Sequence, residues 1–565
     1  MLEPINPTGS HPSQATLATQ GSLATHINIA HECLDRHLLS AHPTQGSHPT
    51  QATLATQGTV SKADQTAMIF VHESRGRREF TYRQLTEATQ RVAGIFQSAG
   101  LSRGHRILLL LSNSEWFPIS FFAALRLGAI PVPASMLLTG EEVSYLIRDS
   151  GAQVVVSEPQ LFDAAGIELL GAKLFMAGQS ATLGAQDLTQ AILVAPLIRD
   201  IISTLADDPA YLVYTSGTTG YPKGVLHAHR ALYGRLPSGS HWFHFGEHER
   251  ILHSGKFNWT YVLGTGMMDP LFHGKSVVVY EGKNDAAGWV RLIAEEKCTT
   301  FIGVPTIYRQ ILQKTEFTAE DVPTLRHCMC AGEHLSEPVQ LAWRERFGMN
   351  IYEGLGMSEC SYYISQNRTD EIRPGSAGKI QPWHLVELLD ENFQPVAPDE
   401  EGVLCIRRED AGLFICYWNL PEENAKVFHV QTCADGTQQT WFVTGDYARM
   451  DREGYIWFIG RKDDIIKSFG YRLSPYEIER VMKGHPDISD CAAVPEVIDA
   501  EKTIVALCVM LKNDAHISES EILAWSKGHL AEYKRPKKVY ILPDFPRTAN
   551  GKILRKNLLA KVHSI

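Results

Sequence analysis

The sequence contains no uninterrupted apolar stretch long enough to cross a membrane. A spanning helix needs about 20 consecutive apolar residues, and the nearest candidate, residues 117–138, is interrupted by Arg126, Pro131 and Pro133. The first residues, MLEPINPTGSHPSQATLATQ, have neither the basic start nor the apolar core of a secretory signal. We therefore expect no membrane span, and we interpret 117–138 as a buried helix that runs into a strand.

Concentrated positive charge is also missing. The chain carries 53 Lys and Arg against 63 Asp and Glu, a formal net charge of -10, and neither sign forms long runs. Proteins whose main ligand is a nucleic acid gather basic side chains on one face to neutralise phosphates. We therefore expect no nucleic-acid partner.

Cysteine pairs of the CxxC type, which mark zinc sites and redox motifs, are missing too. The 10 cysteines are scattered along the chain, and Cys328 and Cys330 would share one face of a strand without closing a useful loop. Because disulfides form mainly in oxidising compartments, we expect reduced thiols and a cytoplasmic protein.

Large apolar residues are scarce in residues 1–65. The segment SHPSQATLATQGS (Ser10–Ser22) nearly recurs as SHPTQATLATQGT (Ser47–Thr59). Two copies are too few for a solenoid, and segments rich in Thr, Gln, Ser and Gly bury little surface. We interpret 1–65 as a low-complexity N-terminal extension in which the duplicated segment flanks one helix, Ile27–Leu39.

From about Thr66 the sequence alternates between strands and helices. TAMIFVH, HRILLLLS and AQVVVSE are typical of buried strands, and a helix is predicted to open at Thr81 and to stop at Gly100. Short apolar strands separated by helices predict parallel sheets covered on both faces. The expected fold class is α/β, with a large N-terminal domain at 66–461. Charged pairs beside Gly454 suggest an exposed joint, and the helices and strands beyond it predict a small α+β domain at 462–565.

The stretch YTSGTTGYPKG (Tyr214–Gly224) offers glycines, hydroxyls and one lysine, but almost no side chain for a core. Consecutive Gly, Thr and Ser allow a tight turn whose N–H groups converge on an anion, and Lys223 adds a positive charge. The pattern indicates a phosphate-binding loop. It is not a Walker loop, because no Lys-Ser or Lys-Thr ends a GxxxxG run.

The longer stretch YTSGTTGYPKGVLHAH resembles the signature of the adenylate-forming superfamily: acyl-CoA and aryl-CoA ligases, carrier-protein-loading adenylation domains and beetle luciferases. The family's later signatures follow in the family's order: AGEHL at 331–335, YEGLGMSE at 352–359, RPGSAGK at 373–379, TGDY at 444–447, GRKDDIIKSFGYRLSPYEIE at 460–479 and PRTANGKILR at 546–555. The resemblance covers about Thr66 to Lys556. It implies the adenylate-forming ligase fold, in which the small C-terminal domain is mobile.

The resemblance implies a reaction in two steps. A carboxylate attacks the α-phosphate of ATP and expels pyrophosphate, and the acyl group then passes to a thiol. Because both partners of the first step are anionic, the site must supply positive charge and geometry. The implied ligands are ATP, Mg²⁺ and coenzyme A, and the implied ATP-binding residues are Thr215, Ser216, Gly217, Thr218, Thr219, Gly220, Gly332, Glu333, Tyr352, Glu353, Gly354, Ser358, Asp446 and Arg461.

Three charged residues are implied to carry the catalysis. Glu359 matches the family's magnesium ligand, and one carboxylate suffices because magnesium keeps several waters. Lys223 would bind the β- and γ-phosphates. Lys552 matches the lysine that bridges the attacking carboxylate and the nucleotide, a task for the point-like ammonium of Lys rather than the planar Arg fork. Asp446 and Arg461 match the residues that hydrogen-bond the ribose hydroxyls.

Other positions concern the second step and departures from the family pattern. Asp463 matches the hinge of the small domain, Gly470 would leave room for the pantetheine arm, and Arg472 could contact the CoA phosphates. His334 stands where the family usually has proline, and Ser358 stands where it has threonine and keeps the hydroxyl.

The position of FNWTYVLGTG implies a pocket for the acyl group, with Leu355 and Gly356 at its floor. Acetate-specific relatives place tryptophan near that floor, so Gly356 predicts room for a larger acid. The motifs look most like those of benzoate-type and medium-chain acyl-CoA ligases. The implied pocket residues are Phe257, Trp259, Tyr261, Gly264, Leu355 and Gly356.

Three hypotheses follow for function. We favour a free-standing ligase that joins an aromatic or medium-chain acid to CoA. The alternative is an enzyme that adenylates an acid and loads it onto a phosphopantetheinyl carrier protein in trans. The third is a non-catalytic relative that serves as a binding module, and the joint presence of Lys223, Glu359, Asp446, Arg461 and Lys552 argues against it.

Overall fold

The computed structural model describes residues 26–39, 62–163, 166–215, 222–433, 435–461, 466–468, 471–498, 503–512, 515–547 and 553–562. The chain divides into two compact units. Unit 1 consists of Met1–Tyr233, Met267–Glu281 and Phe414–Cys416. Unit 2 consists of Gly234–Gly266, Gly282–Leu413 and Tyr417–Ile565.

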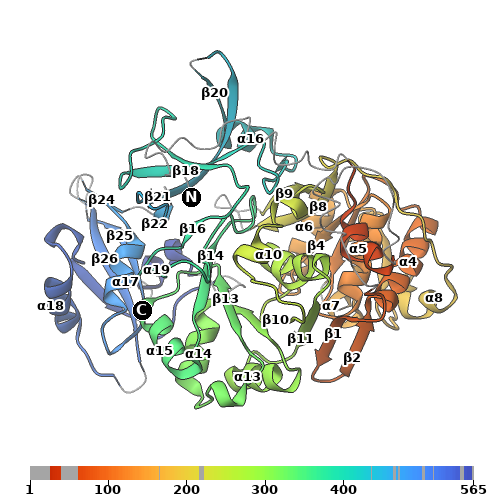
Figure 1. Ribbon diagram of the computed structural model, residues 1–565, viewed down its shortest axis with the longest axis horizontal. Coiled ribbons are helices and arrows are strands. Elements are labelled where there is room, and N and C mark those ends of the chain that lie inside the picture. The colour runs from red at the N-terminus through yellow and green to blue at the C-terminus, as the bar shows by residue number, and fades with distance from the viewer. Residues whose placement is uncertain are drawn as a thin grey trace, which may run out of the picture. The chain divides into compact units, whose positions relative to one another are not determined.

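A parallel sheet forms the main layer of unit 1 (Figure 1, red to yellow). Its order is β4-β3-β5-β6-β7, and every neighbouring pair is parallel. The strands are β3 (Arg106–Leu110), β4 (Ile130–Pro133), β5 (Val154–Ser157), β6 (Lys173–Met176) and β7 (Gln186–Asp187). The helices that alternate with them are α4 (Tyr82–Ser98), α5 (Trp116–Arg126), α6 (Gly140–Ser150), α7 (Pro159–Phe162) and α8 (Leu188–Val194). The predicted alternation is confirmed, as is the buried helix after residue 115, since every residue of α5 is buried.

Helix α4 begins where the sequence predicted. The Thr81 hydroxyl accepts from the Gln84 N–H at 3.2 Å, and the Gln84 side chain accepts from the Thr81 N–H at 2.9 Å. This reciprocal capping box satisfies two N–H groups that the helix itself leaves unpaired. The helix ends at Ser98, and Gly100 follows with a φ of 91°.

Two further strand groups complete unit 1. β1 (Thr66–His72) pairs in parallel with β11 (Ser276–Glu281) and antiparallel with β2 (Gly76–Thr81). β8 (Pro209–Thr215) and β9 (Lys223–Ala228) form an antiparallel hairpin. The remaining short elements here are α9 (Ala231–Gly234), α12 (Asp269–Phe272) and β19 (Cys416–Tyr417).

The helix predicted at Ile27–Leu39 is shorter than expected and interrupted. α2 (Ile29–Cys33) ends at Leu34, whose φ of -126° and ψ of -68° leave the helical region, and the 3-10 helix η1 (Asp35–Leu38) follows. The segment packs within unit 1, where the Asn28 amide donates to the Leu125 carbonyl at 2.8 Å and Asp35 pairs with buried Arg126. This part of the 1–65 segment therefore contributes to the core of unit 1. The duplicated segment lies outside the described residues.

Unit 2 contains a second parallel arrangement. β10 (Arg250–His253), β12 (Thr300–Gly303), β13 (His327–Ala331) and β14 (Ile351–Leu355) run parallel in that order. β15 (Ile364–Ser365) and β16 (Lys379–Ile380) continue the sheet antiparallel. The helices of this region are α10 (Ser238–His241), α11 (Thr260–Leu263), α13 (Ala286–Glu295), α14 (Pro305–Lys314) and α15 (Glu337–Phe347), with the π-helical turn η2 (Gly264–Met268) and the 3-10 turn η3 (Ala319–Asp321).

An antiparallel sheet follows in the chain. Its order is β17-β18-β21-β20, and β22 pairs with β21. The bounds are β17 (Val386–Leu389), β18 (Glu401–Arg407), β20 (Phe428–Thr432), β21 (Gln438–Met450) and β22 (Ile456–Arg461), with α16 (Pro421–Val427) before β20. The pairing of β21 with β22 sets Asp446 directly opposite Arg461.

The C-terminal part of unit 2 has the predicted α+β composition (Figure 1, blue). β25 (Ile488–Val497), β26 (Thr503–Leu511) and β27 (Lys538–Ile541) form its sheet. One hydrophobic cluster joins this sheet to α17 (Pro475–Met482) and α18 (Glu519–His529), and a second cluster joins it to α19 (Arg555–Val562). The other elements are β23 (Ile466–Ser468), β24 (Tyr471–Leu473) and η4 (Glu532–Lys534).

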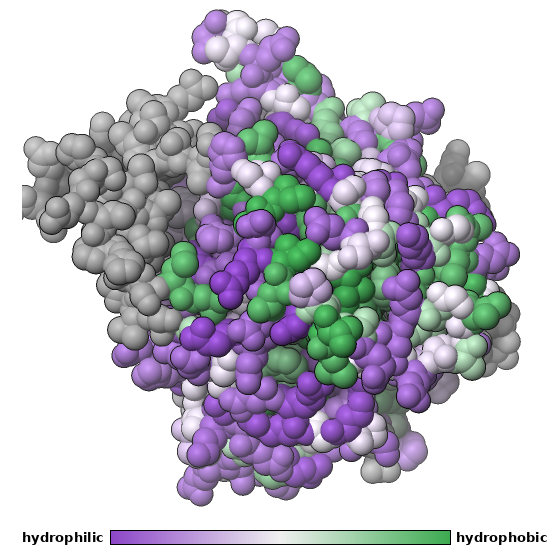
Figure 2. All heavy atoms as spheres, turned by 90° about the vertical axis from the view of Figure 1, so that its right-hand side faces the viewer, coloured by the Kyte–Doolittle hydropathy of each residue, from purple (hydrophilic) through white to green (hydrophobic). Residues whose placement is uncertain are grey.

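Surface and thiol properties agree with the sequence. Among the residues that the structure describes, no helix is both long and apolar enough to span a membrane. On the face shown in Figure 2, hydrophobic residues form small groups between hydrophilic ones. No disulfide joins any of the ten cysteines, all of which lie in described segments.

Candidate active site

A cavity of about 590 Å³ in unit 2 brings together predicted site residues from distant parts of the sequence. The predicted residues that line it are Gly332, Glu333, Glu353, Gly354, Leu355, Gly356, Asp446 and Arg461. Further walls come from later segments, including Tyr476, Arg480 and Lys534. Together with RPGSAGK, which contributes Gly375 and Ala377, five motifs that the sequence could only place in order share one cavity.

The carboxyl ends of two parallel strands form one wall of this cavity. Ala331 at the end of β13 lies opposite Gly354 in β14, so the turns after both strands lie at the same edge of the sheet. Ligands of α/β proteins bind at this edge. Gly332 has a φ of 89°, a conformation that favours glycine, and a Cβ on it would lie 2.9 Å from the Trp259 ring.

Acidic side chains in these turns are held by hydrogen bonds. Glu333 accepts from the Thr306 hydroxyl at 2.8 Å, and Glu353 accepts from the Leu335 N–H at 3.2 Å. His334, which replaces the usual proline, places its Nδ1 3.3 Å from the Glu353 carboxylate. The departure from the family pattern thus adds a polar contact at the cavity wall.

Asp446 and Arg461 form an ion pair across β21 and β22. Arg461 Nε donates to Asp446 Oδ1 at 3.0 Å, and the Asp446 N–H donates to the Thr444 hydroxyl at 3.0 Å. The Asp446 carboxylate raises the pKa of Arg461, with a further contribution from Glu359. Asp446 is buried at the cavity wall, so its charge acts in a medium that screens less than water.

Glu359 does not line this cavity but is fixed by a residue that the motifs did not indicate. The Tyr417 hydroxyl donates to Glu359 Oε1 at 2.7 Å. Burial, together with the negative charge of Glu359, raises the pKa of Tyr417, so the phenol keeps its proton and remains a donor. Tyr417 lies 58 residues from Glu359 in sequence, and no local spacing links the two. Beside Glu359, the Ser358 hydroxyl lies 3.3 Å from the Thr260 hydroxyl.

Two of the residues predicted for the acyl pocket, Trp259 and Tyr261, belong to an aromatic cluster in unit 2. Tyr261 lies at ring distances of 5.2 Å from Trp259 and 6.2 Å from Trp242, and both Tyr261 and Phe257 are buried. Burial raises the pKa of Tyr261 well above its usual value. Because Trp259 also lies against Gly332, the cluster adjoins the cavity wall at that glycine.

Two glycines of this region are required by close packing. A Cβ on Gly264 would lie 2.4 Å from the Tyr362 hydroxyl, and a Cβ on Gly356 would lie 2.0 Å from the Tyr362 backbone nitrogen. Gly356 was predicted to leave room for a larger acid. The structure supplies a different reason for glycine there, since any side chain at this position would meet the Tyr362 backbone.

The remaining predicted residues fall elsewhere. Tyr352 is not among the residues that line the cavity, and its ring stacks on His327 at 4.9 Å. In unit 1, Thr215 and Lys223 lie opposite each other at the end of the β8–β9 hairpin. Arg472 lies in β24, and its side chain is not described. The following residues lie outside the described segments: Ser216, Gly217, Thr218, Thr219, Gly220, Asp463, Gly470 and Lys552.

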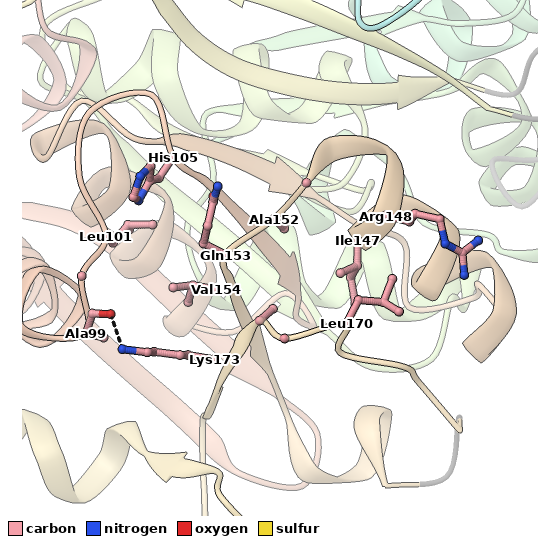
Figure 3. A pocket seen from close by; sticks show the side chains of 14 residues that line it. Ala99, Leu101, His105, Ile147, Arg148, Ala152, Gln153, Val154, Leu170 and Lys173 are labelled. Carbon is pink, nitrogen blue, oxygen red and sulfur yellow. Dashed lines mark hydrogen bonds between the residues drawn. The ribbon is translucent and has the colours of Figure 1, made fainter.

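A second cavity, of about 540 Å³, lies in unit 1 (Figure 3). Its walls come from the ends of α4 and α6 and the starts of β5 and β6. Lys173 Nζ donates to the Ala99 carbonyl at 2.7 Å, an interaction that caps the last turn of α4. None of the predicted site residues is among those that line this cavity.

Two family models match the chain. The AMP-binding enzyme model matches residues 55–418, and the model of the AMP-binding enzyme C-terminal domain matches residues 477–552. A 3-hydroxybenzoate–CoA/4-hydroxybenzoate–CoA ligase from Thauera aromatica is 31% identical over 88% of this chain and 93% of that protein. A mitochondrial acyl-coenzyme A synthetase from Homo sapiens is 30% identical over 85% of this chain and 84% of that protein.

Solved structures agree with these matches. An anthranilate CoA ligase in complex with anthranoyl-AMP aligns with a TM-score of 0.82 at 28% identity, covering 96% of this chain and 98% of that one. A benzoate CoA ligase from Burkholderia xenovorans aligns with a TM-score of 0.77 at 27% identity, covering 88% and 97%. The adenylate-forming ligase fold expected from the motifs is confirmed. The chain belongs to the AMP-binding enzyme family.

Proposed function

We propose that this protein is an ATP-dependent carboxylic acid–CoA ligase that works through an acyl-adenylate. Its substrates would be ATP, coenzyme A and an aromatic or medium-chain acid, and its products acyl-CoA, AMP and pyrophosphate. The observation that carries the proposal is the convergence of Asp446, Arg461 and the turn at Gly332–Glu333 on one cavity. The substrate class is supported by the names of its relatives, which include hydroxybenzoate–CoA, benzoate CoA and anthranilate CoA ligases.

The first half-reaction needs a site that holds nucleotide and acid in line. A carboxylate oxygen of the acid attacks the α-phosphorus, and the bond from that phosphorus to the oxygen of the leaving pyrophosphate breaks. Asp446 is suited to accept hydrogen bonds from two ribose hydroxyls, because Arg461 already fixes its carboxylate at 3.0 Å. Positioned charges of this kind contribute most of the stabilisation in phosphoryl and nucleotidyl transfer.

The donor set beside Tyr417 fits magnesium. One oxygen of Glu359 accepts from Tyr417, and within the described residues the other oxygen has no hydrogen bond. A single carboxylate oxygen is enough, because magnesium retains several waters and takes one or two protein carboxylates. Bound magnesium would neutralise phosphate charge, while Tyr417 keeps Glu359 in a fixed orientation.

The second half-reaction transfers the acyl group to sulfur. The CoA thiol attacks the carbonyl carbon, the bond to the AMP oxygen breaks, and the thiol proton is released. We assign Gly470 and Arg472 to CoA binding and Asp463 to a hinge between domains at 66–461 and 462–565. Lys552 is assigned to the adenylation step. These assignments rest on the motifs.

Pyrophosphate release over a panel of acids tests the proposal. We expect magnesium-dependent release with benzoate-like or medium-length acids, faster turnover with CoA, and formation of acyl-CoA. Products of ADP and orthophosphate would contradict the adenylate mechanism. Adenylate formation without turnover on CoA, but with turnover on a pantetheinylated carrier protein, would favour the alternative acceptor.

A further inference from the structure

Three side chains with metal-binding atoms meet in unit 2, outside the cavity described above. They are Cys360 after β14, His384 after β16 and Asp410 after β18. The thiol sulfur, a ring nitrogen and a carboxylate oxygen all lie within 4.8 Å of one another. The sulfur comes from a fully buried cysteine, and the side chains of His384 and Asp410 are each 1% exposed.

Asp410 holds His384 in one orientation. His384 Nδ1 lies 3.0 Å from Asp410 Oδ2, and the same carboxylate accepts N–H groups from Leu385 and Gly412, each at 2.8 Å. The buried carboxylate of Asp410 is therefore surrounded by three hydrogen-bonding partners.

The two ring nitrogens of His384 have different surroundings. Nδ1 faces Asp410, whereas Nε2, on the other side of the ring, is buried and has no hydrogen-bond partner among the described residues. An ion shared by all three side chains would therefore bind His384 through Nδ1 and replace its hydrogen bond to Asp410.

Gly412 leaves the space in which the three groups gather. A Cβ on Gly412 would lie 3.0 Å from His384 Cε1, 3.2 Å from Asp410 Oδ1 and 3.5 Å from Cys360 Sγ. A side chain there would press on all three groups. Glycine is therefore the residue that permits this arrangement.

We propose that Cys360, His384 and Asp410 form a site for a thiophilic divalent cation, with zinc as the first candidate. Thiolate, imidazole and carboxylate are the ligands that zinc takes in proteins, and three of them leave one position of a tetrahedron for water. A thiolate and a carboxylate carry two negative charges, so a dication would neutralise the buried cluster. Ligand atoms around tetrahedral zinc lie about 3.5 Å apart, so a separation at the 4.8 Å limit would have to close by about 1 Å.

The site has a direct connection to the proposed chemistry. Cys360 follows Glu359 in sequence, and it pairs with Leu413 in an isolated antiparallel bridge. A cation held by the three side chains would link the loop that carries Glu359 to the segments of His384 and Asp410. Its ligand set differs from that of magnesium, which prefers oxygen.

Cobalt substitution tests the site in the full chain, independently of catalysis. The protein is stripped with a chelator and titrated with Co²⁺. We expect a near-ultraviolet charge-transfer band from thiolate coordination that saturates at one equivalent and disappears when Zn²⁺ is added. We also expect one retained zinc per chain, measured by elemental analysis after reconstitution and dialysis.

Substitutions assign the band to the cluster. Cys360→Ser is expected to remove it, whereas Cys405→Ser, at a buried cysteine of β18 outside the cluster, keeps it. Absence of the band and of retained zinc in the wild-type protein would overturn the proposal, as would a band that survives Cys360→Ser. If Cys360→Ser does not fold, the wild-type titration and zinc content decide alone.

Discussion

The two cavities have similar volumes, about 540 Å³ in unit 1 and about 590 Å³ in unit 2, but their walls are built differently. The walls of the first come from residues 99–173, one continuous region of the sequence. The walls of the second come from segments that range from Gly332 to Lys534 and include an ion pair. A site that many segments build together can place several functional groups around one ligand. Volume alone would not have separated the two cavities.

The largest effect is expected from Lys552, the residue that we assign to the adenylation step. Lys552→Ala should slow adenylation by about 100- to 1000-fold, because it removes a positive charge that stabilises the transition state. The same variant should convert supplied acyl-adenylate to acyl-CoA at close to the wild-type rate. The measurement is a pair of half-reaction assays. Equal loss in both halves would contradict the separate role of Lys552 in the first step.

A smaller but clear loss is expected at the wall of the unit 2 cavity. Asp446→Asn should lower kcat/KM for ATP by about 100-fold, since hydrogen bonds to a charged group contribute about 1.5–3 kcal/mol each. Asp64→Asn removes a carboxylate that pairs with Arg83 on the surface of unit 1, and it serves as the control with unchanged kinetics. Equal ATP kinetics in both variants would remove the unit 2 cavity from consideration as the nucleotide site.

A moderate effect is expected at Tyr417. Tyr417→Phe removes one hydrogen bond to Glu359, which contributes about 1 kcal/mol, so half-maximal activity should require about 5-fold more magnesium. The matched variant Tyr455→Phe removes a hydrogen bond to the Glu371 carbonyl instead, and its magnesium response should not change. A Tyr417→Phe enzyme with reduced kcat and an unaltered magnesium curve would show that Tyr417 does not act through Glu359.

The smallest effect is expected in the unit 1 cavity. Lys173→Gln removes an exposed cation that caps α4, and surface changes of this kind usually alter stability by about 0.5 kcal/mol or less. Steady-state kinetics and a thermal melt should both match the wild type. A severalfold fall in kcat/KM would instead show that the unit 1 cavity affects catalysis. The two cavities would then no longer differ in function.

Local features of the fold were predictable from the sequence, whereas long-range contacts were not. Thr81 and Gln84 are three residues apart, so the capping box that opens α4 is visible in the sequence. No pattern marks the break at Leu34, after which Asp35 pairs with Arg126, 91 residues away. The hydrogen bond from Tyr417 to Glu359 and the approach of Trp259 to Gly332 arise only when separate segments fold together.

The N-terminal segment also sets an order of events during protein synthesis. Asn28 and Asp35 leave the ribosome before their partners Leu125 and Arg126, which follow more than 90 residues later, and Leu271, whose carbonyl lies 2.8 Å from His37 Nε2, is 234 residues from that histidine. At about 5–20 residues per second, the segment spends roughly 10–50 s without its full set of contacts. The segment is therefore made well before the partners that fix it in unit 1, and chaperones have that interval in which to bind it.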